Sequence, residues 1–239
     1  MTQYNPNATF ESGISFRSFL SKVFSTLAIG LAISGVVAFL VASNFETILY
    51  ALGSSFTIIM LVAIIAELVV GIMFTARLMK MSKGEAWTCY IIYSILTGLS
   101  LALIIQGYTS GSVVFAFIAT VILFACMAII GHTTRIDLTR FTSMFMVGLV
   151  AILITSLLNA LLFKSVMVNY VITIVGVIVF LGLIAYDMQK LRQLYESGYM
   201  NQEFEEKMKI YGAFTLYLDF INLFIRLLQI FGRGNSSKK

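Results

Sequence analysis

Two aspartates near the end of the chain lie in apolar surroundings, where a charged group is costly. Asp187 closes the apolar run that follows Lys164, and Asp219 lies inside the last apolar run. Two carboxylates in contact cannot both ionise cheaply, so such a pair shares a proton. Loss of the proton would push their helices apart or recruit a hard cation such as calcium. If the two side chains meet, the sequence therefore predicts a proton-sensitive latch, and with it a pH sensor and a candidate calcium site, at Asp187 and Asp219.

Four further polar residues are candidate partners of this pair or candidate pore-lining residues. Glu67 stands midway along an apolar run, where it would attract cations. Arg77 ends the same run and either reaches inward or anchors the helix at the membrane surface. Asn222 and Arg226 share a helical face with Asp219. Arg226 either pairs with that aspartate or extends toward the far interface.

The composition predicts that these residues are held by a membrane-embedded protein. Hydrophobic residues make up 59% of the 239 residues and charged residues 11%, against roughly 25% charged in ordinary soluble domains. A soluble fold has too few polar residues here to cover its surface. The net charge of +5 comes from basic residues between apolar runs, without the basic stripe of a nucleic-acid-binding protein. Lipid is the expected surrounding, and nucleic acid is not an expected partner.

The apolar runs predict seven transmembrane helices, since a helix needs about 20 apolar residues to cross the hydrocarbon core. The runs are continuous rather than alternating, which excludes a transmembrane barrel. Residues 1–22 form a polar N-terminal segment, 188–210 a charged connection too polar for lipid, and 232–239 a polar tail. The last run either crosses or re-enters, and its length favours crossing. The expected spans lie at roughly 23–42, 56–76, 86–105, 112–131, 141–162, 166–187 and 211–231.

Basic residues predict that the N-terminus is cytoplasmic, because Lys and Arg are enriched in cytoplasmic loops. The opposite side would hold Lys164 and the basic tail. A bacterial plasma membrane is the expected location of the bundle. The residues on the predicted cytoplasmic side are Arg17, Lys22, Arg77, Lys80, Lys83, Arg135, Arg140, Lys190, Arg192, Lys207 and Lys209.

The remaining candidate ligands do not predict a resident metal or cofactor. Cys89 and Cys126 both lie in apolar runs, where buried unpaired thiols are expected. The single histidine, His132, excludes a zinc cluster. It belongs to a short polar loop with Asp137, and a helix-capping turn is the expected structure there.

Several strings resemble the Bax inhibitor family of membrane proteins. They are Ala185-Tyr-Asp-Met-Gln-Lys190, Thr215-Leu-Tyr-Leu-Asp-Phe-Ile-Asn-Leu-Phe224, Thr134-Arg-Ile-Asp-Leu-Thr139 and Leu96-Thr-Gly-Leu99. The resemblance covers nearly the whole chain and is most specific in the last span. It implies a seven-helix bundle in which six helices surround the last.

The resemblance also implies two kinds of function. Some members are associated with a pH-regulated calcium leak gated by an aspartate pair, which Asp187 and Asp219 match. Bacterial members of this type carry an arginine late in the second span, for which Arg77, displaced by a residue, is the nearest equivalent. Other members modulate membrane proteolysis or cell death. The alternative to a channel is thus a non-conducting protein that regulates a membrane partner.

Two further classes fit the sequence less well. Paired aspartates also occur in intramembrane proteases, but Asp219 follows Leu-Tyr-Leu rather than glycine, and the only proline is Pro6. We therefore expect no enzymatic activity. A proton-coupled transporter would also place carboxylates in spans, but no matching pair of interrupted helices points to alternating access.

Overall fold

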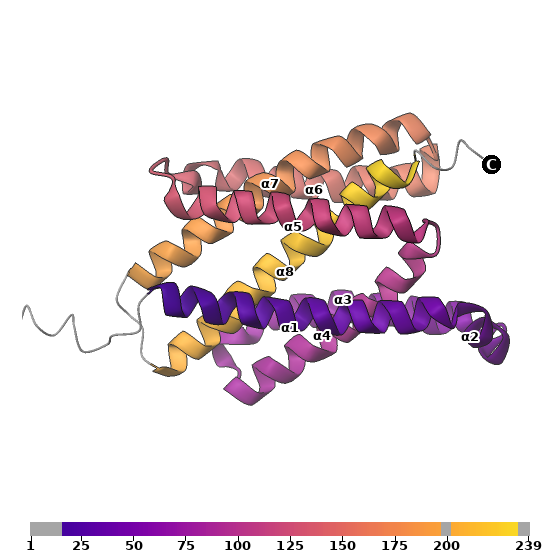
Figure 1. Ribbon diagram of the computed structural model, residues 1–239, viewed down its shortest axis with the longest axis horizontal. Coiled ribbons are helices and arrows are strands. Elements are labelled where there is room, and N and C mark those ends of the chain that lie inside the picture. The colour runs from indigo at the N-terminus through magenta and orange to yellow at the C-terminus, as the bar shows by residue number, and fades with distance from the viewer. Residues whose placement is uncertain (1–15, 197–201, 234–239) are drawn as a thin grey trace, which may run out of the picture.

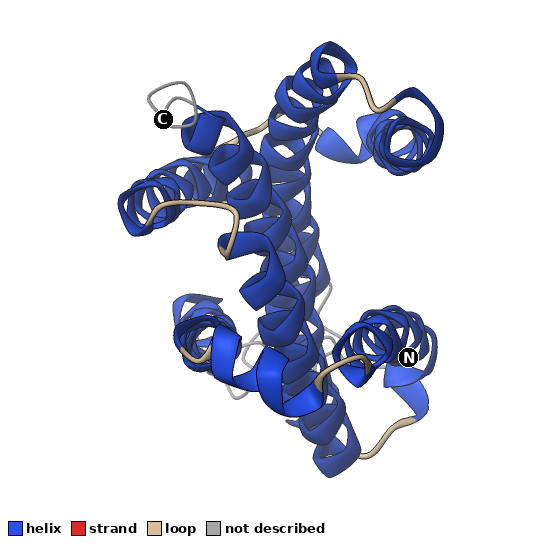
Figure 2. Cartoon of the chain, turned by 90° about the vertical axis from the view of Figure 1, so that its right-hand side faces the viewer, coloured by secondary structure: helices blue, strands red, loops and turns tan. Residues whose placement is uncertain are grey.

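The computed structural model describes residues 16–196 and 202–233, and every element in these ranges is a helix (Figure 2). Seven helices in the described ranges are long and apolar enough to cross a membrane. The predicted all-helical class with seven candidate spans is thus confirmed. In chain order the elements are α1 (Phe16–Ser43), α2 (Phe45–Leu52), α3 (Ser55–Arg77), η1 (Leu78–Lys80), α4 (Lys83–Ile105), α5 (Ser110–Thr133), η2 (Leu138–Phe141), α6 (Thr142–Leu158), η3 (Asn159–Phe163), α7 (Val166–Glu196) and α8 (Gln202–Arg233).

The last helix, α8, runs obliquely between two groups of three helices (Figure 1). One group is α1, α3 and α4, and the other is α5, α6 and α7. Four helices pack along α8, namely α1, α4, α5 and α7, while α3 packs on α4 and α6 packs on α7. The most apolar part of α8 is 56% buried, against 33% or less in the other spans. The expected ring of six is therefore an inner set of four helices with two outer ones.

Several helices extend beyond the predicted spans. Helix α1 begins at Phe16 rather than near residue 23, and most of the predicted polar connection 188–210 is helical, because α7 ends at Glu196 and α8 begins at Gln202. The charges of these polar ends are paired. The ion pairs are Lys22–Glu205 at 3.1 Å, Lys83–Glu206 at 2.9 Å and Arg192–Glu196 at 2.8 Å.

Residues 1–15 and 234–239, parts of the predicted terminal segments, lie outside the described residues.

Polar side chains fix where individual helices begin and turn. The Ser82 hydroxyl accepts from the Glu85 amide, and the Glu85 carboxylate accepts from the Ser82 amide at 2.7 Å. This reciprocal capping box satisfies donors that would otherwise be free at the start of α4. Between α6 and α7, Lys164 adopts a left-handed backbone with φ 47°. The Asn159 side chain closes that turn by bonding both backbone groups of Ser165.

Small residues, among them Gly30 and Ser34 of α1, allow α1 and α4 to pack closely. A Cβ atom at Gly30 would lie 2.2 Å from the Tyr90 hydroxyl oxygen, so a larger residue cannot fit without displacing the ring. The Ser34 hydroxyl donates to the Ser94 carbonyl at 2.8 Å across the same contact. A glycine and a serine therefore set the distance between α1 and α4.

The two cysteines are free, but only one lies partly inside the protein. Cys89 is half-buried, whereas Cys126 is exposed on α5. The prediction of a buried thiol is thus wrong for Cys126. The reason is that an apolar residue in a span can face lipid instead of a neighbouring helix, so apolar sequence context does not establish burial.

Candidate functional site

The two predicted aspartates meet between α7 and α8. Asp187 lies in the last third of α7 and is half-buried, whereas Asp219 lies near the middle of α8 and is only 5% exposed. Their side chains are in hydrogen-bonding contact. Oδ2 of Asp219 is buried without a hydrogen-bond partner among the described residues. This carboxyl oxygen is therefore available for a proton or a cation.

A lysine on the same helix completes the electrostatic surroundings of Asp187. Lys190 lies three residues further along α7, and its charge acts on the Asp187 carboxyl group. The Lys190 ammonium lies 5.8 Å from the centre of the Tyr186 ring and 5.9 Å from that of Tyr211. These contacts hold a cation over two aromatic faces. The sequence pattern indicated Lys190 only as a basic residue of the cytoplasmic side, although its three-residue spacing from Asp187 places both side chains on one face.

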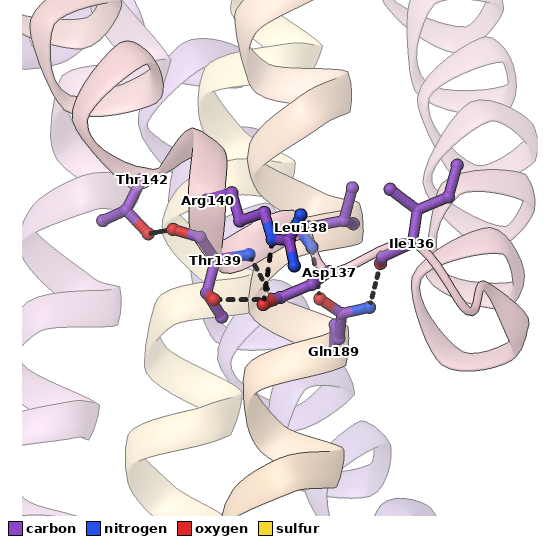
Figure 3. Close-up of polar contacts among 7 residues, drawn as sticks. All are labelled: Ile136, Asp137, Leu138, Thr139, Arg140, Thr142 and Gln189. Carbon is purple, nitrogen blue, oxygen red and sulfur yellow. Dashed lines mark hydrogen bonds and ion pairs between the residues drawn. The ribbon is translucent and has the colours of Figure 1, made fainter.

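A loop between α5 and α6 is bound to α7 two residues beyond Asp187 (Figure 3). The Gln189 side chain accepts from the Leu138 amide and donates to the Ile136 carbonyl, both at 2.7 Å. Gln189 is 6% exposed, so these bonds satisfy a buried amide on both of its polar atoms. The loop thus fixes the rotation of α7 beside the aspartate pair. Gln189 belongs to the string Ala185–Lys190 that resembles the Bax inhibitor family, but the resemblance did not indicate that this string binds the loop.

The same loop forms the capping turn expected from the sequence. Asp137 accepts from the Thr139 amide at 3.0 Å and from the Thr139 hydroxyl at 2.6 Å, and Arg140 lies 3.7 Å away (Figure 3). The Thr139 hydroxyl and amide, helped by the charge of Arg140, hold the pKa of Asp137 below its usual value. Asp137 is therefore a structural carboxylate, outside the contact between Asp187 and Asp219.

A glycine brings α5 against α7 near the aspartate pair. A Cβ atom at Gly131 would lie 2.2 Å from the carbonyl oxygen of Ala185 and 2.7 Å from its Cα atom. Both are backbone atoms, which cannot rotate away as a side chain can. Only glycine permits this approach, so Gly131 sets the position of the α7 segment that carries Asp187.

Glu67 is placed away from the aspartate pair, between α3 and α4. Its carboxylate accepts from the Thr97 hydroxyl at 2.8 Å and from the Ser100 hydroxyl. The charge of Glu67 also acts on Tyr217 of α8, whose hydroxyl contacts both Thr97 and Ser34. A polar cluster therefore joins α3, α4, α8 and α1 at membrane depth. No hydrogen bond or ion pair between Glu67 and the two aspartates is found in the described part of the chain.

Arg226 and Asn222 follow Asp219 along α8 but are not bonded to it among the described residues. Asn222 donates to the Leu218 carbonyl of its own helix at 2.8 Å. Arg226 donates to the Gln229 side chain at 3.4 Å, a long bond for this donor. Its side chain lies over Gly176 of α7, where an added Cβ would be 3.1 Å from Nε. Of the two alternatives for Arg226, the pairing with Asp219 is therefore not formed among the described residues.

Arg77 is exposed at the end of α3. Its charge acts on Glu85 at the start of α4. Within residues 16–196 and 202–233, no hydrogen bond or ion pair joins Arg77 to Asp187 or Asp219. The inward-reaching alternative is thus not formed.

These observations define a class: a multi-pass α-helical membrane protein in which a carboxyl group of the central helix α8 contacts a carboxyl group of α7. The family model described as "Inhibitor of apoptosis-promoting Bax1" matches residues 16–236. The chain therefore belongs to the Bax inhibitor family, and the resemblance to this family inferred from the sequence is confirmed.

Bacterial proteins similar to this chain cover nearly all of its length. Inner membrane protein YbhL of Escherichia coli K12 is 37% identical over 217 residues, which is 90% of this chain and 92% of that protein. An uncharacterised protein of Borreliella burgdorferi is 38% identical over 217 residues, 90% of this chain and 91% of its own. The uncharacterised protein RP147 of Rickettsia prowazekii is 35% identical over 234 residues, 97% and 95% of the two chains.

Proposed function

We propose that this protein is a pH-sensitive calcium leak channel whose gate is the carboxyl pair of Asp187 and Asp219. The observation that supports the proposal is the contact of these two side chains between α7 and α8, with Asp219 buried on the central helix. The proposal assigns no catalytic step and no resident cofactor to the chain. Calcium and protons are its ligands.

The gating step follows from the electrostatics of two contacting carboxyl groups. With one shared proton the pair forms a hydrogen bond that holds α7 to α8. Without it, two negative charges about 4 Å apart repel by roughly 4 kcal/mol at an effective dielectric constant near 20. This repulsion is relieved when the helices separate or when a cation binds between the carboxylates. Calcium suits such a position because it prefers oxygen ligands.

The other acid and base candidates have supporting roles in this proposal. Glu67 raises the local concentration of cations in the membrane. In this proposal Asn222 and Arg226 would lie along the path beyond Asp219. Arg226, which lies over Gly176, would oppose free passage of cations there. The protein would lie in a bacterial inner membrane, as the name of its E. coli relative states for that protein. Its N-terminus would be cytoplasmic, with the last helix crossing the bilayer.

Calcium flux into liposomes tests the channel and the gate separately. Purified protein is reconstituted with an internal calcium dye, and flux is measured at pH values between about 5 and 8, the range over which shifted carboxyl pairs release a proton. We expect the wild-type flux to rise with pH. Asp187→Asn and Asp219→Asn should abolish this dependence, whereas the matched control Asp137→Asn, a carboxylate outside the pair, should retain it.

The possible results discriminate between the two functions. If the wild type passes no calcium at any pH, the channel proposal is wrong. A flux that keeps its pH dependence in both Asn variants would refute the aspartate gate while leaving the channel intact.

The second candidate is a non-conducting protein that regulates a membrane partner, such as a membrane protease or a component of a stress or cell-death pathway. The position of Arg226 favours it, because a guanidinium beside Gly176 places a fixed positive charge along the α7–α8 contact. In that case the aspartates serve only helix packing. Absence of flux together with reduced thermal stability of the Asn variants would support this candidate over the channel.

A further inference from the structure

Two adjoining apolar cavities lie along the contact between the two helix groups, with α1 as one wall and α5 as the other. Their volumes are about 610 and 460 Å³, and both are lined by Leu31, Phe117 and Phe220. Together they are several times larger than the ~150 Å³ apolar cavity that holds a benzene molecule. We name the smaller cavity, which adjoins the start of α1, the α1/α5 groove.

We propose that the α1/α5 groove is a binding site for an anionic phospholipid. Its acyl chain would lie between α1 and α5, and its phosphate would lie beside Arg17. This site requires neither calcium conduction nor a gating role of the aspartate pair. Three properties of the groove support a lipid as its occupant: its lining, its length and the charge at its end.

The lining of the groove is apolar and lies within the membrane-spanning segments. Phe24 of α1 and Phe124 of α5 pack edge to face with ring centres 6.5 Å apart. Ala28 and Ala125 are exposed on the two walls of the groove. Water in such a cavity would find almost no polar partner. The surrounding medium at this depth is lipid, so an acyl chain is the molecule that fills the space.

The length of the groove matches one leaflet of a bilayer. Along α1 it extends from Leu20 to Leu31, which corresponds to about 16 Å of helix at 1.5 Å per residue. The hydrocarbon core of a bilayer is about 30 Å thick. A single acyl chain from one leaflet would therefore run from the mouth of the groove to Phe117 and Phe220 at its inner end.

The end of the groove carries the charge that a phosphate requires. Arg17 lies one turn before Leu20 on the same face of α1 and is exposed. His132 lines the groove at the end of α5, and its ring stacks on Phe16 with centres 5.3 Å apart. A guanidinium at the headgroup level binds a phosphate bidentately, so the site should prefer an anionic lipid over a zwitterionic one.

An occupant of the groove would touch both helices that carry the aspartates. Met188 of α7 and Phe220 of α8 line it, and each is the residue directly after an aspartate. A bound acyl chain would therefore restrain α7 and α8 against each other, whether or not the protein conducts calcium.

Retention of phospholipid by the purified protein tests the proposal. The full chain is extracted in a mild detergent from membranes that contain phosphatidylglycerol, and bound lipid is counted by native mass spectrometry. We expect one tightly held phospholipid per wild-type chain. Ala28→Trp and Ala125→Trp fill the groove from its opposite walls and should each reduce retention about tenfold. The matched control is Ala151→Trp, at an exposed alanine of α6 outside both cavities, which should retain the lipid.

The headgroup contact is tested by exchange with lipids of equal chain length. Wild type should prefer phosphatidylglycerol to phosphatidylcholine by roughly fivefold, the effect of one basic residue near a membrane surface. Arg17→Gln should remove the preference but still bind both lipids. Wild-type protein without retained phospholipid would overturn the proposal. Retention by both Trp variants at the wild-type level would overturn it too. A wild-type dimer that the Trp variants convert to monomer would overturn it as well, because the groove would then be a subunit interface.

Discussion

Replacing Gly131 with alanine should destabilise the protein by separating α5 from α7. The added Cβ would lie 2.2 Å from the Ala185 carbonyl oxygen, whereas ordinary contact begins at 3.4 Å. The two helices must therefore move apart by about 1 Å, and overpacking of this kind costs about 1–3 kcal/mol. At about 2–4 °C per kcal/mol for chains of this size, a cost in the middle of this range lowers the melting temperature by roughly 4–8 °C.

The melting temperature can be measured by fluorescence-detected size-exclusion of detergent-solubilised protein after heating. The matched control is Gly111→Ala near the start of the same helix, where an added Cβ meets no atom within 4 Å. Alanine is the better helix former by about 1 kcal/mol, so Gly111→Ala should leave the melting temperature unchanged or raise it. The reasoning fails if Gly131→Ala melts with the wild type, or if the two substitutions destabilise equally.

Two further predictions concern the loop between α5 and α6. Gln189→Ala removes both bonds to the loop and leaves the Leu138 amide without its partner, which costs about 1–3 kcal/mol. Hydrogen exchange at Leu138 should accelerate about tenfold or more, and an unchanged rate would show that the bonds do not hold the loop. Because the pKa of Asp137 is lowered chiefly by the Thr139 hydroxyl, its contribution to loop stability is complete above the usual pKa of an aspartate. That contribution is lost as the pH falls through the lowered value. Protection of the Thr139 amide should decrease over that acidic range in the wild type and lose this pH dependence in Asp137→Asn; equal pH profiles would contradict the assignment.

The sequence could predict the aspartate pair because the physical penalty for charge in lipid is large and local. An acid in an apolar run stands out without any knowledge of its neighbours. The same rule selected Glu67 and Arg226, which the structure places outside the pair. The penalty shows that a charged residue needs a partner or a polar cavity, but it does not identify which one. For Glu67 the partners are the hydroxyls of Thr97 and Ser100. Nothing in the sequence shows that these two hydroxyls bind Glu67.

The residues that position the pair could not be predicted, because their roles depend on which helix faces meet. Nothing distinguishes Gly131 from other glycines before α5 is packed against α7. The string that contains Gln189 stands out, but it does not show that Gln189 binds the loop after α5. Helices α1, α7 and α8 extend beyond the predicted spans, because a helix can continue outside the hydrocarbon core. The charged ends of α1 and α8 are joined by an ion pair between distant parts of the chain, Lys22 with Glu205, whereas Arg192 and Glu196 pair within α7. Hydropathy measures only the solvent preference of each segment.

The position of α8 gives the proposed gate a direction of movement. Tyr217 and Asp219 are two residues apart, so their side chains leave α8 on roughly opposite sides at 3.6 residues per turn. Tyr217 is fully buried and contacts the Ser34 hydroxyl of α1, while Asp219 contacts Asp187 of α7. The contact with α1 involves neutral hydroxyl groups, whereas the contact with α7 involves carboxyl groups that can lose a proton. Deprotonation would therefore weaken the attachment of α8 to α7 while leaving its attachment to α1 intact. We expect the α5–α6–α7 group to move relative to α8, and the α1–α3–α4 group to stay with it.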